Sequence, residues 1–156
     1  MSVAPETFDD DPFVTGLMTT PVVAITADAR LPVALRVMAA EHVRHLVVVD
    51  RGRCVGLLQE GEVARLLLGP ATPREVPPLP VGAVCRTVPR LAPGERRSTA
   101  ARRMHAAGVD ACLVADGERV LGIVTATDVL TSLAAAEVGR VDGGLGAPGG
   151  AELAQQ

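Results

Sequence analysis

The feature that most constrains this sequence is an internal repeat with a constant displacement of 66 residues. Adding 66 to every residue number from Gly16 to Leu68 gives a second copy, Gly82 to Ala134, without a gap. Identical residues recur at the pairs Val22/Val88, Arg30/Arg96, Arg36/Arg102, Met38/Met104, Val43/Val109, Val48/Val114, Asp50/Asp116, Gly56/Gly122, Val63/Val129 and Leu67/Leu133. Apolar character is also kept at most strand-like positions, so the chain is a tandem repeat.

Each copy predicts the order strand, helix, strand, strand, helix. In the first copy, the expected strands cover 22–25, 46–49 and 54–58. The first helix has apolar residues at positions i, i+3, i+4 and i+7, namely Leu31, Ala34, Leu35 and Met38, and the second helix is expected over 62–68. A unit of this size is too small to form a complete hydrophobic core on its own. The expected fold is therefore α/β (α+β), with two β-α-β-β-α repeats packed by pseudo-twofold symmetry.

Changes in composition divide the chain into five segments. The start is acidic and has no periodicity, a Pro-rich stretch favours an extended connector, and the Gly-rich end predicts a disordered tail. The expected segments are 1–13 (frayed), 14–68 (first repeat), 69–80 (linker), 81–136 (second repeat) and 137–156 (tail).

The overall charge and hydropathy exclude two classes of partner. The formal charge of -3, with only two phenylalanines as aromatic residues, leaves neither a basic surface nor stacking platforms for nucleic acid. No apolar run reaches the roughly 18 residues that a membrane helix needs. The acidic start also differs from a secretion signal, which is basic and then apolar. We therefore expect no nucleic-acid or membrane partner and a cytoplasmic location.

Residues with catalytic or metal-binding chemistry form no recognisable pattern. Cys54, Cys85 and Cys112 lack a CxxC spacing and are expected to be reduced core residues. No histidine has a second ligand at metal spacing, so no metal site is expected. The chain has no GxSxG, HExxH or P-loop motif, and we therefore predict no catalytic residues and no enzymatic activity.

The most informative polar stretch runs from Gly122 to Asp128. It joins a strand-like run to a helix, and a helix start carries unpaired N–H groups and partial positive charge. Thr125, Thr127 and Asp128 either cap the helix themselves or hold an anionic, hydroxylated ligand there. The residues alone leave both interpretations open.

Three segments together resemble a pair of CBS (cystathionine-beta-synthase) domains, a Bateman module standing alone. They are MTTPV at 18–22, ALRVMAAEHVRHLVVVDRGRCVGLL at 34–58 and VDACLVADGERVLGIVTATDVL at 109–130. The resemblance covers about residues 14 to 136. It implies two repeats meeting through their sheets, with two clefts between them, and modules that join through exposed helices. Family members typically bind adenosine-containing ligands and regulate an attached or partner protein.

The resemblance also implies roles for particular residues. Asp128 matches the family's ribose-binding acid, and Thr125, with Thr127 beside it, matches the hydroxyl near ribose or phosphate. Arg44 and His45 match the cations that face the phosphate tail. The positions that match the adenine slot are Val88, Pro89, Arg90, Asp110, Ala111 and Cys112. Simpler interpretations remain for two of these sets: Asp128 as a helix cap, and Arg44 and His45 as solvated residues at a strand edge.

The first repeat departs from the family pattern at its strand-to-helix junction. Gln59 replaces the hydroxyl, Glu62 replaces the aspartate, and Glu60 adds a negative charge where a phosphate would approach. In the second repeat, Asp110 stands where the first has Arg44. The sequence therefore predicts one competent cleft per chain.

The predicted function is a non-catalytic regulatory module that needs no cofactor. Its ligand is expected to be AMP, ADP or ATP, or S-adenosylmethionine, and its occupancy is expected to reach a partner protein or a dimer interface. A homodimer is expected through the apolar helix faces at Leu66–Leu68, Leu130, Leu133 and Ala134–Ala136. The alternative is a degenerate pair that acts as a dimeric scaffold without nucleotide.

Overall fold

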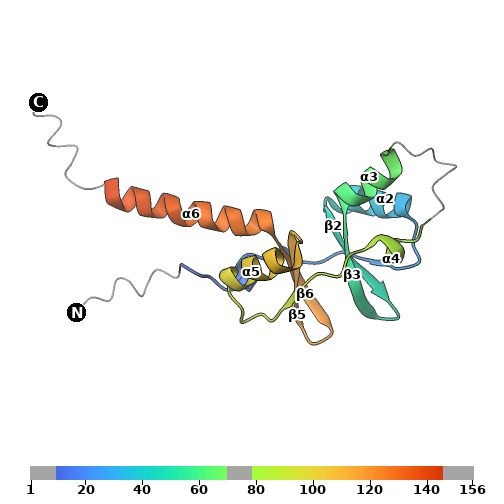
Figure 1. Cartoon of the computed structure of the whole chain (residues 1–156), viewed down its shortest axis with the longest axis horizontal. Helices are drawn as coiled ribbons and strands as arrows, with labels where there is room; N and C mark the ends of the chain where they lie inside the picture. The colour runs from blue at the N-terminus through green and yellow to red at the C-terminus, as the bar shows by residue number, and fades with distance from the viewer. Residues whose placement is uncertain (1–9, 70–78, 146–156) are drawn as a thin grey trace, which may run out of the picture.

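Two three-stranded sheets, one in each repeat, form the centre of the molecule (Figure 1). The computed structural model describes residues 10–69 and 79–145. In each sheet a short first strand runs parallel to the middle strand, and the middle strand pairs antiparallel with the third. The strands are β1 (Ala24–Thr26), β2 (His45–Asp50), β3 (Arg53–Gln59), β4 (Arg90–Leu91), β5 (Ala111–Asp116) and β6 (Arg119–Thr125). The predicted β-α-β-β-α order is confirmed in both repeats.

Equivalent helices in the two repeats bury equivalent faces. In α2 (Leu31–Glu41) the buried residues include Met38, and in α5 (Arg97–Ala107) they include its repeat partner Met104. The predicted apolar spacing of α2 is confirmed, with Leu35 only partly buried. The closing helices are α3 (Glu60–Leu68) and α6 (Ala126–Leu145). Burial of one helical stripe against a sheet explains both helix pairs.

The segment that leads into each repeat crosses over to the other repeat. The 3-10 helix η1 (Val14–Gly16) supplies Val14 to the core of the second repeat, where its N–H donates to Glu95 O at 2.8 Å. The short helix α4 (Val81–Val84) supplies Val81 to the core of the first repeat and lies beside β3 (Figure 1). Both valines are 0% exposed, so each core is completed by the start of the other repeat.

A third buried cluster joins the two sheets face to face. Its buried members are Val47, Leu57, Ala111, Leu113 and Ile123, which come from both repeats. When the two sheets pack together, the apolar surfaces of both are removed from water. The packed pair is therefore more stable than either repeat alone.

Residues 10–13 are not frayed as the sequence suggested. The carboxylate of Asp11 accepts hydrogen bonds from the backbone N–H and the hydroxyl of Ser98 at 2.8 and 2.5 Å. Arg97, only 8% exposed, donates to the carbonyl of Asp10 and to the hydroxyl of Ser132 at 2.8 Å. Asp11 thus satisfies an N–H at the start of α5, a capping contact from a distant segment.

The expected tail is also partly helical. Helix α6 continues past Ala136 to Leu145 and projects away from the two sheets (Figure 1). Alanines 134–136 and Glu137 are strong helix formers, and each residue added to an existing helix gains a hydrogen bond, so the glycines that follow do not end it at once. The remainder of the expected tail, the N-terminal residues 1–9 and linker residues 70–78 lie outside the described residues.

Candidate functional site

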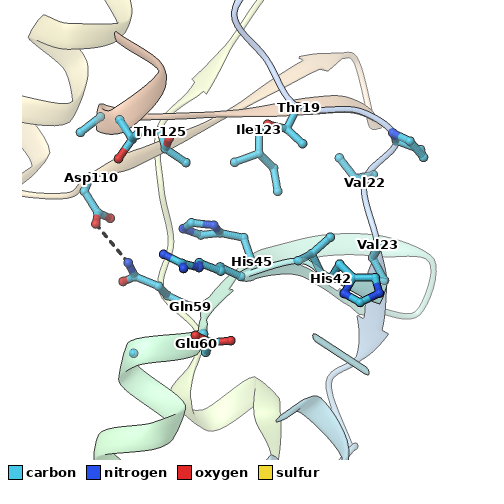
Figure 2. Close-up of a pocket in the computed structure, with 16 residues that line it drawn as sticks. Thr19, Val22, Val23, His42, His45, Gln59, Glu60, Asp110, Ile123 and Thr125 are labelled. Atoms are coloured by element: carbon cyan, nitrogen blue, oxygen red, sulfur yellow. Dashed lines mark hydrogen bonds between the residues drawn. The ribbon is translucent and has the colours of Figure 1, made fainter. Parts of the chain in front are cut away.

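A cavity of about 550 Å³ lies between the two repeats (Figure 2). The first repeat contributes its entry segment, the start of β2 and the β3–α3 junction, and the second contributes the start of β5 and the β6–α6 junction. The side chains that matter below are Thr19, Val22, Val23, Arg44, His45, Gln59, Glu60, Asp110, Ile123, Thr125 and Thr127. The lining combines apolar side chains with polar and charged ones, as small-molecule sites generally do.

His45 is the central polar side chain of the cavity. Helix α2 ends at Glu41, and the left-handed backbone of the next residue, His42 (φ 57°), reverses the chain and brings His45 to the first position of β2. The imidazole points between Thr125 and Gln59 (Figure 2). Its Nε2 is buried and has no hydrogen-bond partner among the residues that the structure describes. Such an atom costs free energy unless water or a ligand satisfies it.

The charge state of His45 follows from its surroundings. Burial lowers the pKa of this imidazole, because desolvation disfavours the charged form. The carboxylates of Asp110 and Asp128 act in the opposite direction, and Arg44 adds to the lowering. The neutral form is therefore favoured at pH 7, and a neutral imidazole has one donor and one acceptor nitrogen.

A hydrogen bond connects the two repeats across the cavity. The amide Nε2 of Gln59 donates to Oδ2 of Asp110 at 3.1 Å, and both side chains border the cavity (Figure 2). Gln59 lies where the family pattern has a hydroxyl. In this chain it therefore fixes the Asp110 carboxylate at the cavity edge.

Thr125 and Asp128 form a reciprocal cap at the start of α6. Oδ2 of Asp128 accepts from the backbone N–H of Thr125 at 2.8 Å and from its hydroxyl at 3.0 Å. The N–H of Asp128 in turn donates to Thr125 Oγ1 at 3.2 Å. This is the capping-box arrangement, with Thr125 at the N-cap. It holds the Thr125 side chain at the cavity, while Asp128 lines a separate hollow with Gly16 and Leu17.

The structure brings some of the predicted site residues together and separates others. Arg44, His45, Thr125, Thr127 and Asp110 all line the cavity. The remaining members of the predicted adenine slot do not. Cys112 is buried in the core of the second repeat, Ala111 belongs to the cluster between the sheets, Arg90 donates to the carbonyl of Cys54 at 2.6 Å, and Val88 and Pro89 are not among the lining residues.

The apolar wall comes instead from Val22, Val23 and Ile123, with Thr19 beside them. The reason is the crossing of the entry segments. Thr19 pairs with Ile123 through hydrogen bonds of 2.8 and 3.2 Å, so the start of the first repeat runs along the last strand of the second. Val22 is the repeat partner of Val88. The repeat therefore pointed to this pair of equivalent valines. Only the crossing of the entry segment shows that Val22, rather than Val88, lies on the same cavity as Thr125.

The family model of the CBS domain matches residues 14–69 and 81–135, which is more than half of the chain. The chain belongs to the CBS-domain family. A comparison with curated protein sequences finds no match.

Solved structures of CBS proteins have the same fold as this CBS pair. A conserved CBS-domain protein from Thermoplasma acidophilum is 25% identical with a TM-score of 0.64, over 81% of this chain and 76% of that one. The CBS pair of protein MJ0100, in complex with 5′-methylthioadenosine and S-adenosyl-L-methionine, is 20% identical with a TM-score of 0.63, over 86% and 98%. A hexameric CBS-CP12 protein from bloom-forming cyanobacteria is 21% identical with a TM-score of 0.66, over 77% and 67%.

The first CBS repeat uses its junction acid differently from the second. Glu62 accepts hydrogen bonds from Arg65 at 3.1 Å and from Arg86, which belongs to the segment that crosses from the second repeat. In the sequence, Glu62 replaces the aspartate of the family pattern, and the repulsion of a phosphate was predicted from Glu60. In the structure the charge of Glu62 is paired with two guanidinium groups, because the crossing segment places Arg86 beside it.

Neither a metal-binding group of side chains nor a membrane-spanning helix is found in the part of the CBS pair that the structure describes. No three His, Cys, Asp or Glu side chains there are grouped to hold a metal ion. The three cysteines are free thiols, and burial raises the pKa of Cys112 to about 11, which keeps it protonated. Among the described helices, none has the length and apolar character to cross a bilayer.

Proposed function

We propose that this CBS pair is a regulatory module that binds an adenosine-containing ligand in the cavity between its repeats. The observation that carries the proposal is the buried Nε2 of His45, which faces the cavity without a partner among the described residues. A ligand with polar groups would satisfy this atom and remove the cost of its burial.

The cavity offers surfaces for both an adenine ring and a ribose. Val22, Val23 and Ile123 offer apolar surface for a flat heterocycle, and Thr125, two residues along β6 from Ile123, offers a hydroxyl beside them. The volume of about 550 Å³ falls within the roughly 300–1,000 Å³ range of small-molecule sites. The complex of the MJ0100 pair with two adenosine compounds supports this ligand class for the fold.

Asp128 is proposed to contribute to ligand binding indirectly. The family pattern predicts a direct bond from this acid to the ribose, whereas its Oδ2 here holds the Thr125 backbone and hydroxyl. We propose that Asp128 acts first by positioning Thr125. Arg44, also on the cavity, is the cation closest in sequence to His45 and is proposed to contact the ligand beyond the ribose.

The test measures the melting temperature and then the affinity for AMP, ADP, ATP and S-adenosylmethionine. A ligand that binds only the folded chain must raise the melting temperature. His45→Ala should weaken binding by about tenfold, the value of one buried hydrogen bond. The matched control is His105→Ala, because His105 is exposed on α5 and does not line the cavity. Equal losses from both variants would remove the role assigned to His45.

Stoichiometry tests a second part of the proposal. One site per chain is expected, because the equivalent junction in the first repeat has its acid paired with Arg86 and Arg65. Calorimetric titration that resolves two equal sites would contradict the proposed difference between the repeats.

The alternative function, a dimeric scaffold, has one structural observation in its favour. Leu68 on α3 is 83% exposed, and Leu130 and Leu133 on α6 are 65% and 46% exposed. Exposed leucines on the closing helices fit a second copy of the chain. In this proposal, Leu130→Glu lowers the mass measured by light scattering from that of a dimer to that of a monomer. If no adenosine ligand raises the melting temperature, the scaffold is the better description.

A further inference from the structure

Carboxylates outnumber guanidinium groups in the lining of the cavity. Among the described residues that line it, Arg44 is the one arginine, and it is opposed by the carboxylates of Glu60 and Asp110. Gln59 occupies one oxygen of Asp110 but leaves its charge in place. His45 adds no positive charge at pH 7, since burial lowers its pKa. A polyphosphate entering this cavity would therefore meet more negative charge than positive charge.

The two helix starts at the cavity do not compensate for this. A helix N-terminus attracts anions through its free N–H groups and its dipole. In α3, however, the first turn already contains Glu60 and Glu62. At the start of α6, the carboxylate of Asp128 takes the N–H of Thr125. The first turns of both helices thus already contain the chain's own carboxylates, which repel a phosphate there.

We infer that the cavity selects an adenosine ligand whose 5′ substituent is uncharged or positively charged, a 5′-thioether or sulfonium adenosine, over ADP and ATP. The inference rests on the proposed function and specifies its ligand class. It also differs from the expectation drawn from the Arg44-His45 pair, which counted two cations, whereas only Arg44 of this pair is charged at pH 7 because burial keeps His45 neutral.

Each part of such a ligand has a counterpart in the cavity. A thioether is apolar and packs against aliphatic side chains without losing hydrogen bonds. A sulfonium or ammonium group gains attraction from the Asp110 and Glu60 carboxylates, which repel a phosphate. Arg44 remains available for the carboxylate of an amino-acid tail, a planar pairing that arginine favours.

The experiment is calorimetric titration of the full chain with adenosine, 5′-methylthioadenosine, S-adenosylmethionine, AMP and ATP in one buffer at low salt. We expect 5′-methylthioadenosine and S-adenosylmethionine to bind about tenfold or more tightly than ATP, from the repulsion of uncompensated charges. Glu60→Gln should raise ATP affinity several-fold and leave 5′-methylthioadenosine within about twofold. Glu118→Gln removes the same charge at the exposed β5–β6 turn, away from the cavity lining, and should change neither affinity.

The outcomes separate the two proposals. If adenosine and AMP bind but ATP binds as tightly as 5′-methylthioadenosine, the selectivity is overturned and the adenosine site stands. If adenosine itself does not bind, the proposed function fails and the selectivity fails with it. An equal gain in ATP affinity from Glu60→Gln and Glu118→Gln would show a general charge effect and would also overturn the selectivity.

Discussion

The two strand-to-helix junctions, Gln59–Glu62 and Thr125–Asp128, occupy equivalent positions in the repeat but use their acids in opposite ways. Asp128 turns back and caps its own helix through Thr125. Glu62 reaches outward to Arg86, a residue of the crossing segment. The repeat partner of Arg86 is Thr20, which has no charge. The difference therefore arises from two linked substitutions, a longer acid and a cation opposite it.

This contrast shows where a tandem repeat is constrained and where it is not. The buried faces of α2 and α5 keep Met38 and Met104 at the same position, since close packing penalises a change of volume. The junctions face a cavity or solvent, so polar substitutions there cost less and can change chemistry. One fold thus provides one junction whose acid caps its own helix and one whose acid is paired with a distant arginine.

The largest predicted effects test whether the two cores are equivalent. Met38 and Met104 are 1% and 5% exposed, and truncating either to alanine removes buried surface and leaves a cavity. Met38→Ala and Met104→Ala should each lower the free energy of unfolding by about 2–5 kcal/mol, measured by urea titration. Because each core also contains a segment from the other repeat, one cooperative transition is expected in both variants. A separate transition for one repeat would contradict the interlocked arrangement.

A smaller effect should separate the two junctions. Asp128→Ala removes a capping box and should cost about 1 kcal/mol of unfolding free energy. Glu62→Ala breaks ion pairs with arginines whose side chains are 57% and 71% exposed, and exposed pairs contribute roughly 0–1 kcal/mol. The comparison of the two urea midpoints, with unchanged slopes, checks the order. A larger loss of unfolding free energy from Glu62→Ala than from Asp128→Ala would contradict the expected difference between the two junctions.

The sequence was sufficient for the repeat architecture because that information is local or periodic. The spacing of Leu31, Ala34 and Met38 predicted the buried face of α2, and the repeat carried the prediction to the second half of the chain. The convergence of Arg44 and His45 with Thr125 followed from the family pattern. All three line one cavity in the folded chain.

The features that the sequence did not predict depend on contacts between distant segments of the chain. No local pattern shows that residues 14–19 cross to the second repeat, so the apolar wall was assigned to Val88 and its neighbours rather than to Val22. The pairing of Glu62 with Arg86 and the capping of α5 by Asp11 arise in the same way. The neutral state of His45 depends on its burial, which the sequence does not display.

The equivalent helices α2 and α5 also differ in how their N-termini are capped. Asp11 supplies a side-chain cap to α5, whereas α2 has no side-chain cap at its N-cap residue Arg30. Asp11→Ala should therefore cost about 0.5 kcal/mol at pH 7, at the low end of capping effects because a separate segment must be held in place. The bonds from Ser98 lower the pKa of Asp11, with smaller contributions from Arg97 and Arg96.

The sign of the pH dependence follows from that lowered pKa. The folded chain holds the Asp11 carboxylate in its charged form more strongly than the unfolded chain does. The stabilisation is therefore complete above the ordinary aspartate pKa and is lost as the pH falls through the lowered value. Urea titrations of the wild type and Asp11→Ala should converge at low pH. A difference that persists in strong acid would show that the cap does not depend on the carboxylate charge.

The smallest predicted effect concerns His45, which has no ionisable counterpart in the second repeat, where its partner is Ala111. Burial lowers the pKa of His45, so the unfolded chain binds a proton more readily than the folded chain does. Stability is then present above the ordinary histidine pKa and is lost as the pH falls through the lowered value. His45→Gln, which cannot titrate, should reduce the loss of unfolding free energy between about pH 7 and pH 5.

Asp110→Asn provides the opposing variant. The Asp110 carboxylate raises the pKa of His45 and partly offsets burial, so removing its charge should lower that pKa further and steepen the loss of stability in acid. Asparagine keeps an oxygen that can accept the Gln59 hydrogen bond, which limits the change to charge. Urea titrations at a series of pH values would give the order Asp110→Asn, wild type, His45→Gln from the steepest slope to the shallowest. The reverse order would mean that the field of the cavity, rather than burial, sets the charge of His45, and a charged imidazole would then favour phosphate in the cavity.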